Sequence, residues 1–158
     1  MRTGVRVALD WGGARIGVAA CDPQGSLAFP IGTVKVTTDL AGTMRAVVEL
    51  VTEREPIEVI VGLPRSLSGR EGPAAAAIRE RAVELARAIA PTPVRLVDER
   101  LSTVSAARRL GESGRSARQQ RPVIDAAAAA TILEQALAGE RATDQPPGEV
   151  VSAGTDPT

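Results

Sequence analysis

The segment from Ile57 to Gly62 constrains the fold most strongly, because it is an almost continuous apolar run. Such a run is typical of a strand that is covered on both faces, as happens in partly parallel sheets. A helix is expected on each side of it in the sequence, one with Asp39 as its N-cap and one with Pro73 in its first turn. This order predicts an α/β protein in which helices flank a sheet.

The rest of the chain supplies further strands and helices. Apolar residues with a period of two predict strands, and those with a period of 3.6 predict helices. Three strands form a meander before the first helix, so we expect a mixed five-stranded sheet flanked by helices. The other strands are expected at Val5–Asp10, Ile16–Ala20, Ile31–Val36 and Val94–Val97, and the other helices at Leu101–Leu110 and from Pro122 to about Leu137.

Length and composition bound the domain organisation. A chain of 158 residues has the size of one domain. Residues 139–158 contain Pro, Gly, Thr and acidic residues without periodicity, so we expect a disordered acidic tail after a folded domain of residues 1–138. No apolar run has the length of a membrane span or the character of a signal peptide, and the single cysteine, Cys21, suits a reducing compartment. The expected location is cytoplasmic.

The absence of histidine narrows the chemistry. The chain has no His, no Tyr, one Trp and one Phe. A Ser-His-Asp triad, a Cys-His pair and a His-ligated zinc site are therefore excluded, as is a platform of several stacking aromatic residues. Catalysis would have to use carboxylates, arginines, Lys35, hydroxyls, Cys21, backbone amides or a bound metal.

Three carboxylates are expected to meet at one edge of the sheet. Asp10 ends the first strand, Asp98 and Glu99 end the last, and Asp125 lies on the apolar face of the final helix. Each acid also has a purely structural interpretation, as the cap of a turn or at a helix N-terminus. Together, however, three carboxylates repel one another unless a cation is present, and oxygen ligands without His or Cys select Mg²⁺ or Mn²⁺. Such a cluster typically supports two metals that activate water for phosphodiester hydrolysis.

Several arginines are candidates for binding phosphate. The Gly-rich loop of residues 62–72 precedes a helix N-terminus, where backbone amides could hold an anion, although a plain surface loop explains it equally well. Residues 108–121 form a basic segment that a solvated charge run would also explain. The candidates for contact with a nucleic-acid backbone are Arg15, Arg65, Arg70, Arg100, Arg108, Arg109, Arg115, Arg118 and Arg121.

Four motifs, in this order, resemble those of a known family. They are ALDWGGARIGVA at residues 8–19, VGLP at residues 61–64 with Gly69 and Gly72, DERLST at residues 98–103, and IDAAAAA at residues 124–130. Over residues 4–138 they look like the YqgF/RuvX family, Holliday-junction-resolvase-like proteins of the RNase H superfold. One departure is Ala14, where many members have Lys or another long polar residue.

The resemblance implies an RNase H-like fold and a metal-dependent nuclease in a bacterial cytoplasm. It implies that Asp10, Glu99 and Asp125 are the catalytic metal ligands, whereas spacing alone would also allow Asp98 in place of Glu99. The implied reaction is processing of the 5′ end of pre-16S ribosomal RNA in ribosome biogenesis. Two alternatives stay open: an endonuclease that resolves branched DNA, and a non-catalytic RNA-binding assembly factor. Both a monomer and a homodimer are compatible with the sequence.

Overall fold

The computed structural model describes residues 1–64, 70–98 and 117–152. The helix expected at Leu101–Leu110 lies outside these residues. No helix in the described ranges combines the length and the apolar character needed to cross a membrane. The strands are β1 (Arg6–Trp11), β2 (Arg15–Cys21), β3 (Ala28–Lys35), β4 (Glu58–Leu63), β5 (Val94–Asp98) and β6 (Glu149–Val150), and the helices are α1 (Leu40–Thr52), α2 (Pro73–Ile89) and α4 (Ala117–Thr143).

The strands form one mixed sheet in the order β3-β2-β1-β4-β5-β6. Strands β1, β4 and β5 are parallel to one another, and β2, β3 and β6 each pair antiparallel with a neighbour. The expected mixed sheet is confirmed, with six strands in place of five. The carboxyl ends of the three parallel strands meet at one edge, which is where open α/β sheets bind ligands.

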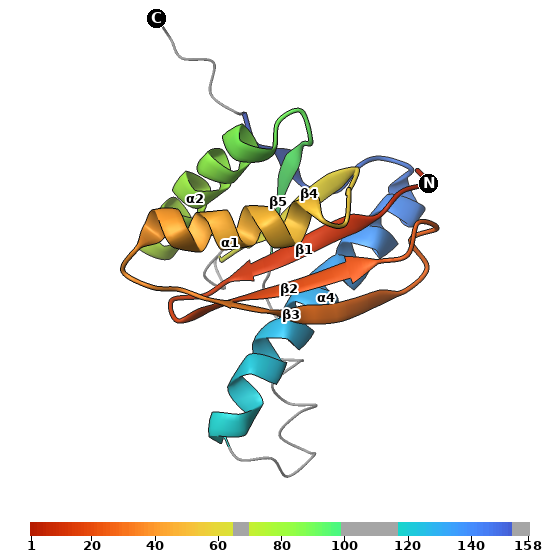
Figure 1. Cartoon of the computed structure of the whole chain (residues 1–158). Coiled ribbons are helices and arrows are strands. Elements are labelled where there is room, and N and C mark those ends of the chain that lie inside the picture. The colour runs from red at the N-terminus through yellow and green to blue at the C-terminus, as the bar shows by residue number, and fades with distance from the viewer. Residues whose placement is uncertain (65–69, 99–116, 153–158) are drawn as a thin grey trace, which may run out of the picture.

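Helices cover both faces of the sheet (Figure 1). Helices α1 and α2 pack on one face, where Val47 and Leu85 join a large core with alternate residues of the strands. Helix α4 crosses the other face, where Ile132 and Leu133 pack on Ala8 and Ile60. The apolar run of β4 is therefore buried from both sides, as predicted.

Local sequence signals placed the starts of α1 and α2 correctly. The side chain of Asp39 accepts a hydrogen bond of 3.0 Å from the backbone N–H of Gly42, as an N-cap does. Pro73 is the first residue of α2, where its missing N–H costs no helical bond. Helix α4, in contrast, begins at Ala117, so the prediction that Pro122 opens it was wrong. The helix continues through Pro122 and loses one backbone hydrogen bond there, because proline has no N–H to donate.

The prediction of a disordered tail from Gly139 onwards was also wrong for the described residues. Helix α4 continues to Thr143, and Glu149–Val150 forms β6 against β5. The helix extends because Glu140, which lies beyond the apolar stripe, is only 2% exposed and pairs with buried arginine. A two-residue strand carries no detectable periodicity. Residues 153–158 lie outside the described residues.

A buried ionic network joins the end of α4 to the amino-terminal edge of the sheet. The Arg6 guanidinium in β1, which is completely buried, lies 2.8 Å from Glu140 Oε2. Arg2 bridges Glu140 and Glu58, with Nε 2.5 Å from Glu140 Oε1 and Nη2 2.9 Å from Glu58 Oε1. Arg95 Nε approaches the other Glu58 oxygen at 3.0 Å. Because such charges are costly to bury alone, the network fixes the position of α4 on the sheet.

Glu140→Gln is expected to destabilise the protein by about 3 kcal/mol at pH 7, because one charge of a buried network is removed. Burial alone would raise the pKa of Glu140, but the Arg2 hydrogen bond and the Arg6 charge outweigh burial and lower the pKa below the ordinary value of 4.5. A carboxylate with a depressed pKa stabilises the fold above its ordinary pKa, and that contribution is lost as pH falls through the folded-state pKa. The difference between wild type and Glu140→Gln should therefore shrink below about pH 4.5.

Urea unfolding between pH 3 and pH 7 measures this difference. The control is Glu134→Gln, because Glu134 is an exposed glutamate of the same helix. It should change the free energy of unfolding by less than about 0.5 kcal/mol. Equal losses in the two variants would contradict a stabilising role for the network.

Candidate active site

Asp10 lies at the carboxyl edge of the sheet, on the face that α4 covers. It pairs with Gly17 of β2 in the antiparallel register. Alternation along β1 puts Asp10 on the same face as Ala8, which packs against α4, and opposite to Leu9, which belongs to the α1–α2 core. Its side chain is half-buried. Asp10 is therefore held on a paired strand directly beneath the path of α4.

Gly17 allows α4 to approach the sheet at this point. A Cβ atom on Gly17 would lie 1.9 Å from the backbone oxygen of Asp125 and 3.0 Å from the backbone nitrogen of Ala126. No residue with a side chain fits there without moving the helix. Since Gly17 is directly opposite Asp10, this close approach puts the backbone of Asp125 one strand away from Asp10, on the same face of the sheet.

Asp125 lies on the sheet-facing side of α4, as expected. It shares that side with Ala129, Ile132 and Ala136, all of which are buried. Sequence analysis placed Asp125 in the first turn, but it is the ninth residue of a helix that begins at Ala117. Its position therefore comes from packing over Gly17, and a helix N-terminus contributes little to it.

The third acid was left open between Asp98 and Glu99. Glu99 lies outside the described residues. Asp98 ends β5 and lies on the same face of the strand as Val94 and Leu96, which belong to the α1–α2 core. It also borders a cavity of about 710 Å³ beside α4. Within residues 1–64, 70–98 and 117–152, no three acidic or cysteine side chains lie close enough together to hold a metal ion. Asp98 therefore does not complete a group with Asp10 and Asp125.

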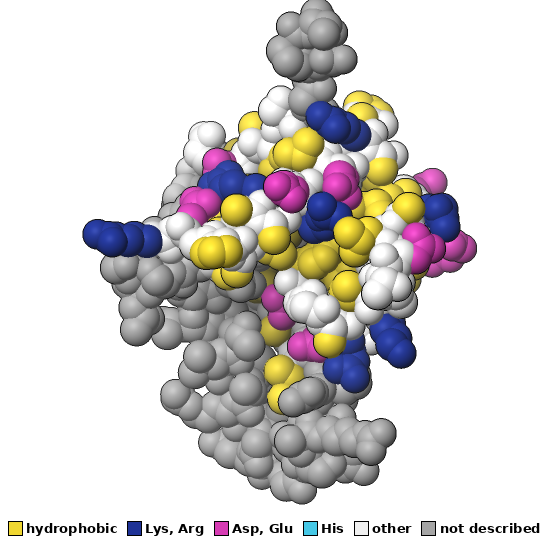
Figure 2. Space-filling view, turned by 90° about the vertical axis from the view of Figure 1, so that its left-hand side faces the viewer, with side chains coloured by type: hydrophobic (Ala, Val, Ile, Leu, Met, Phe, Trp, Pro, Cys, Tyr) yellow, Lys and Arg dark blue, Asp and Glu magenta, His cyan; other side chains and the backbone are white. Residues whose placement is uncertain are grey.

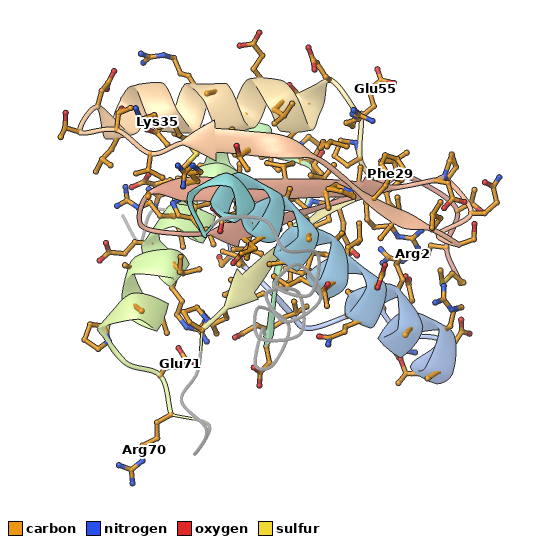
Figure 3. The ribbon with its side chains drawn as sticks, turned by 90° about the horizontal axis from the view of Figure 1, so that it is seen from below. Arg2, Phe29, Lys35, Glu55, Arg70 and Glu71 are labelled. Atoms are coloured by element: carbon orange, nitrogen blue, oxygen red, sulfur yellow. The ribbon has the colours of Figure 1, made fainter. Side chains whose placement is uncertain are left out.

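Few of the predicted phosphate-binding arginines can be placed. Arg15 begins β2, two residues before Gly17, so both residues lie on the face of the sheet that carries Asp10. Arg70 is exposed and projects away from the body of the protein (Figure 3). Arg118 and Arg121 belong to α4. The others lie outside the described residues: Arg65, Arg100, Arg108, Arg109 and Arg115.

The opposite face of the sheet carries a separate apolar hollow at the same edge. Figure 2 views the molecule from the left-hand side of Figure 1, and hydrophobic side chains gather near the centre of that view with basic and acidic groups around them. The hollow has a volume of about 460 Å³ and is lined by Trp11, Val36, Leu40 and Ile78 among others. Alternation in β1 thus divides the edge into a charged side at Asp10 and an apolar side at Trp11.

Sequence reasoning missed two residues of this region. Gly17 was read only as part of a strand, although a glycine inside a strand often marks a close approach of another backbone. Lys35 lies in the strand expected at Ile31–Val36 and is among the possible catalytic groups, but the sequence did not place it near the site. The structure places it directly opposite Arg15, at the end of β3. That pairing depends on strand register, which the sequence pattern alone did not determine.

The mixed sheet, with α4 crossing the face that carries Asp10, defines an RNase H-like α/β protein. The fold is similar to that of Thermus thermophilus RuvC, solved in complex with a Holliday junction substrate, with a TM-score of 0.51 and 20% identity over 89% of this chain and 97% of that one. Residues 4–139 match the model of the family described as "RuvX: Holliday junction resolvase". The chain belongs to the RuvX family.

Curated relatives are similar in sequence to this protein over nearly the whole chain. One, from Streptomyces coelicolor, is 57% identical over 151 residues, covering 96% of this chain and 90% of its own length. Another, from Thermobifida fusca, is 53% identical over 158 residues, covering 96% and 98%. Both carry the name "Putative pre-16S rRNA nuclease".

Proposed function

We propose that this protein is a metal-dependent nuclease that processes the 5′ end of pre-16S ribosomal RNA in the cytoplasm. The observation that carries the proposal is the approach of α4 over Gly17, which puts the backbone of Asp125 one strand away from Asp10 at the carboxyl edge of the sheet. Membership of the RuvX family and the names of its curated relatives support the reaction and the substrate.

The donor groups fit Mg²⁺ or Mn²⁺. Asp10 and Asp125 offer hard carboxylate oxygens, and the chain contains no histidine to favour a softer metal. Two neighbouring carboxylates on one half-buried face repel each other when no cation is present. We propose Asp10, Glu99 and Asp125 as the ligands, with two ions bound per chain.

When bound, the metals would supply an activated water and stabilise the leaving oxygen of the phosphodiester. The residues of this chain supply position and charge. Asp10 is fixed by its place on a paired strand, and Asp125 is fixed by the helix packed over Gly17. Arg15 lies on the same face and is proposed to bind a phosphate of the substrate backbone. Arg100 is proposed as a second contact of the same kind.

The proposal assigns the third ligand to Glu99 in preference to Asp98. One support is the alternation of side chains along β5, which puts Asp98 on the face of the α1–α2 core. The other is that, within the described ranges, Asp98 does not lie close enough to Asp10 and Asp125 to form a three-residue metal site with them. Glu99→Gln is expected to lower the cleavage rate by about 10²-fold or more, whereas Asp98→Asn should retain most activity. Initial rates in Mn²⁺ measure both variants. The reverse order would assign the ligand to Asp98.

The proposed function is tested by offering two labelled substrates: a pre-16S 5′-leader RNA and a four-way DNA junction. Each is incubated with Mn²⁺ and with EDTA, and metal-dependent cutting of the RNA is expected. Preferential cutting of the junction would favour the branched-DNA resolvase. Cleavage that continues in EDTA would exclude the metal mechanism. Binding of the RNA without cleavage under any condition would favour the assembly factor.

A further inference from the structure

Two cations lie opposite each other where β2 begins and β3 ends, and one of them, Arg15, is a diagonal neighbour of Asp10. Arg15 at the start of β2 is the direct register partner of Lys35 at the end of β3. The next residues along, Ile16 and Val34, belong to the α1–α2 core, so Arg15 and Lys35 both lie on the α4 face. Lys35 is the only lysine in the chain.

Neither cation has an acidic partner in the described part of the chain. The ion pairs found there involve other basic groups, such as Arg45 with Asp39 and Arg79 with Glu71. Directly opposed side chains of an antiparallel pair have Cβ atoms about 5 Å apart, and like charges in this position destabilise a sheet. Two unneutralised cations so close together form a site suited to an anion.

The pair is also correctly placed for the substrate. Arg15 is two residues from Gly17, the partner of Asp10, so Arg15 and Asp10 are diagonal neighbours separated by about 7–8 Å. Lys35 extends the row outwards onto the edge strand, where it is exposed. Figure 3 shows Lys35 at the end of β3, at the far end of the molecule from Arg2 and Glu55.

We infer that Lys35 and Arg15 form a clamp for one phosphate group of the nucleic-acid backbone, next to the phosphodiester that is cut. This inference rests on the proposed nuclease function and adds Lys35 to its binding site. The clamp recognises the backbone and not the bases, so it acts on any sequence that reaches the site.

Binding of a labelled single-stranded 5′-leader RNA, measured in EDTA so that metal-dependent cutting does not interfere, tests the clamp. Lys35→Ala and Arg15→Ala should each weaken binding several-fold at low salt. Each should also reduce the slope of log K against log salt concentration by about 1. Because both side chains hold the same phosphate, the double variant should lose less affinity than the product of the two single losses. Lys35→Arg should restore binding.

The matched control is Arg54→Ala. Arg54 is exposed just beyond the end of α1, next to Glu55 and therefore at the opposite end of the molecule from Lys35 (Figure 3). It removes the same charge and should leave the salt slope nearly unchanged. The melting temperature of Lys35→Ala should equal or exceed that of wild type, because a repulsion is removed.

Two outcomes separate the clamp from the nuclease proposal. If wild type cuts RNA but Lys35→Ala binds and responds to salt as Arg54→Ala does, the clamp is excluded and the nuclease stands. If neither substrate is cut but Lys35→Ala and Arg15→Ala weaken RNA binding as described, the clamp stands as a binding site for the RNA backbone, and the RNA-binding assembly factor is favoured over the nuclease. Absence of RNA binding by wild type at low salt would overturn the clamp as well.

Discussion

Asp10→Asn is expected to reduce phosphodiester cleavage by about 10³-fold or more while leaving the protein folded. The amide has nearly the size of the carboxylate but lacks the negative charge that a hard metal ion requires. Losing several kcal/mol of metal-dependent stabilisation of the transition state corresponds to such a factor, since each 1.4 kcal/mol is about tenfold. Initial rates on the leader RNA in Mn²⁺ measure the loss.

A second readout separates lost metal binding from lost structure. Ions that bind only the folded protein raise its melting temperature, so Mn²⁺ should stabilise wild type and have little effect on Asp10→Asn. In EDTA, Asp10→Asn should still unfold in one cooperative transition, because the amide keeps nearly the size and shape of the carboxylate. Titration with Mn²⁺, with the free ion measured by electron paramagnetic resonance, should give two ions bound per wild-type chain.

Asp144→Asn is the matched control for this substitution. This substitution makes the same chemical change at an exposed position, and asparagine tolerates the positive φ of 56° at residue 144 well. It should keep full activity and the full Mn²⁺ effect on melting. If Asp10→Asn behaved in the same way, Asp10 would have no part in metal binding.

The features that sequence analysis predicted correctly are those set by local patterns. The cap at Asp39, the start of α2 at Pro73 and the doubly covered strand β4 each follow from residues within a few positions of one another. The sheet-facing position of Asp125 followed in the same way, from apolar residues spaced along one helix.

The features that it missed depend on contacts between distant residues. Glu140 is buried because Arg6 neutralises it across 134 positions, and no hydrophobic pattern records an ion pair. Arg6 itself alternates as an outward polar residue would, yet it is completely buried. Strand β6 forms because Val150 pairs with Arg95 of β5, and the sequence of a two-residue segment does not predict such a pairing.

The same distinction applies to the candidate site. Asp10 and Asp125 could be proposed from the sequence because each sits at a recognisable place on its own element. Nothing in the sequence singled out Gly17, and Lys35 was only one of several possible catalytic groups, because the importance of both residues depends on which residues lie across from them. Register puts Gly17 opposite Asp10 and Lys35 opposite Arg15. Sequence therefore indicated the chemistry, and strand pairing supplied the geometry that holds it together.

Gly17→Ala tests that geometry and is expected to damage both stability and activity. The new methyl group would lie 1.9 Å from the backbone oxygen and 2.3 Å from the backbone carbon of Asp125, and neither atom can move without the helix. Overpacking of this kind costs about 1–3 kcal/mol. A helix displaced by about 1 Å would also carry Asp125 away from Asp10, and a shift of that size can lower a rate about 10²-fold.

The control is Gly13→Ala in the turn between β1 and β2, where a methyl group would meet nothing within 4 Å apart from the adjacent residues of the chain. Urea unfolding should give a clear loss of stability for Gly17→Ala and almost none for Gly13→Ala. Mn²⁺ should bind more weakly only in Gly17→Ala, because only that substitution moves a ligand. Equal behaviour of the two variants would mean that α4 does not rest on Gly17, and the pairing of Asp10 with Asp125 would fail with it.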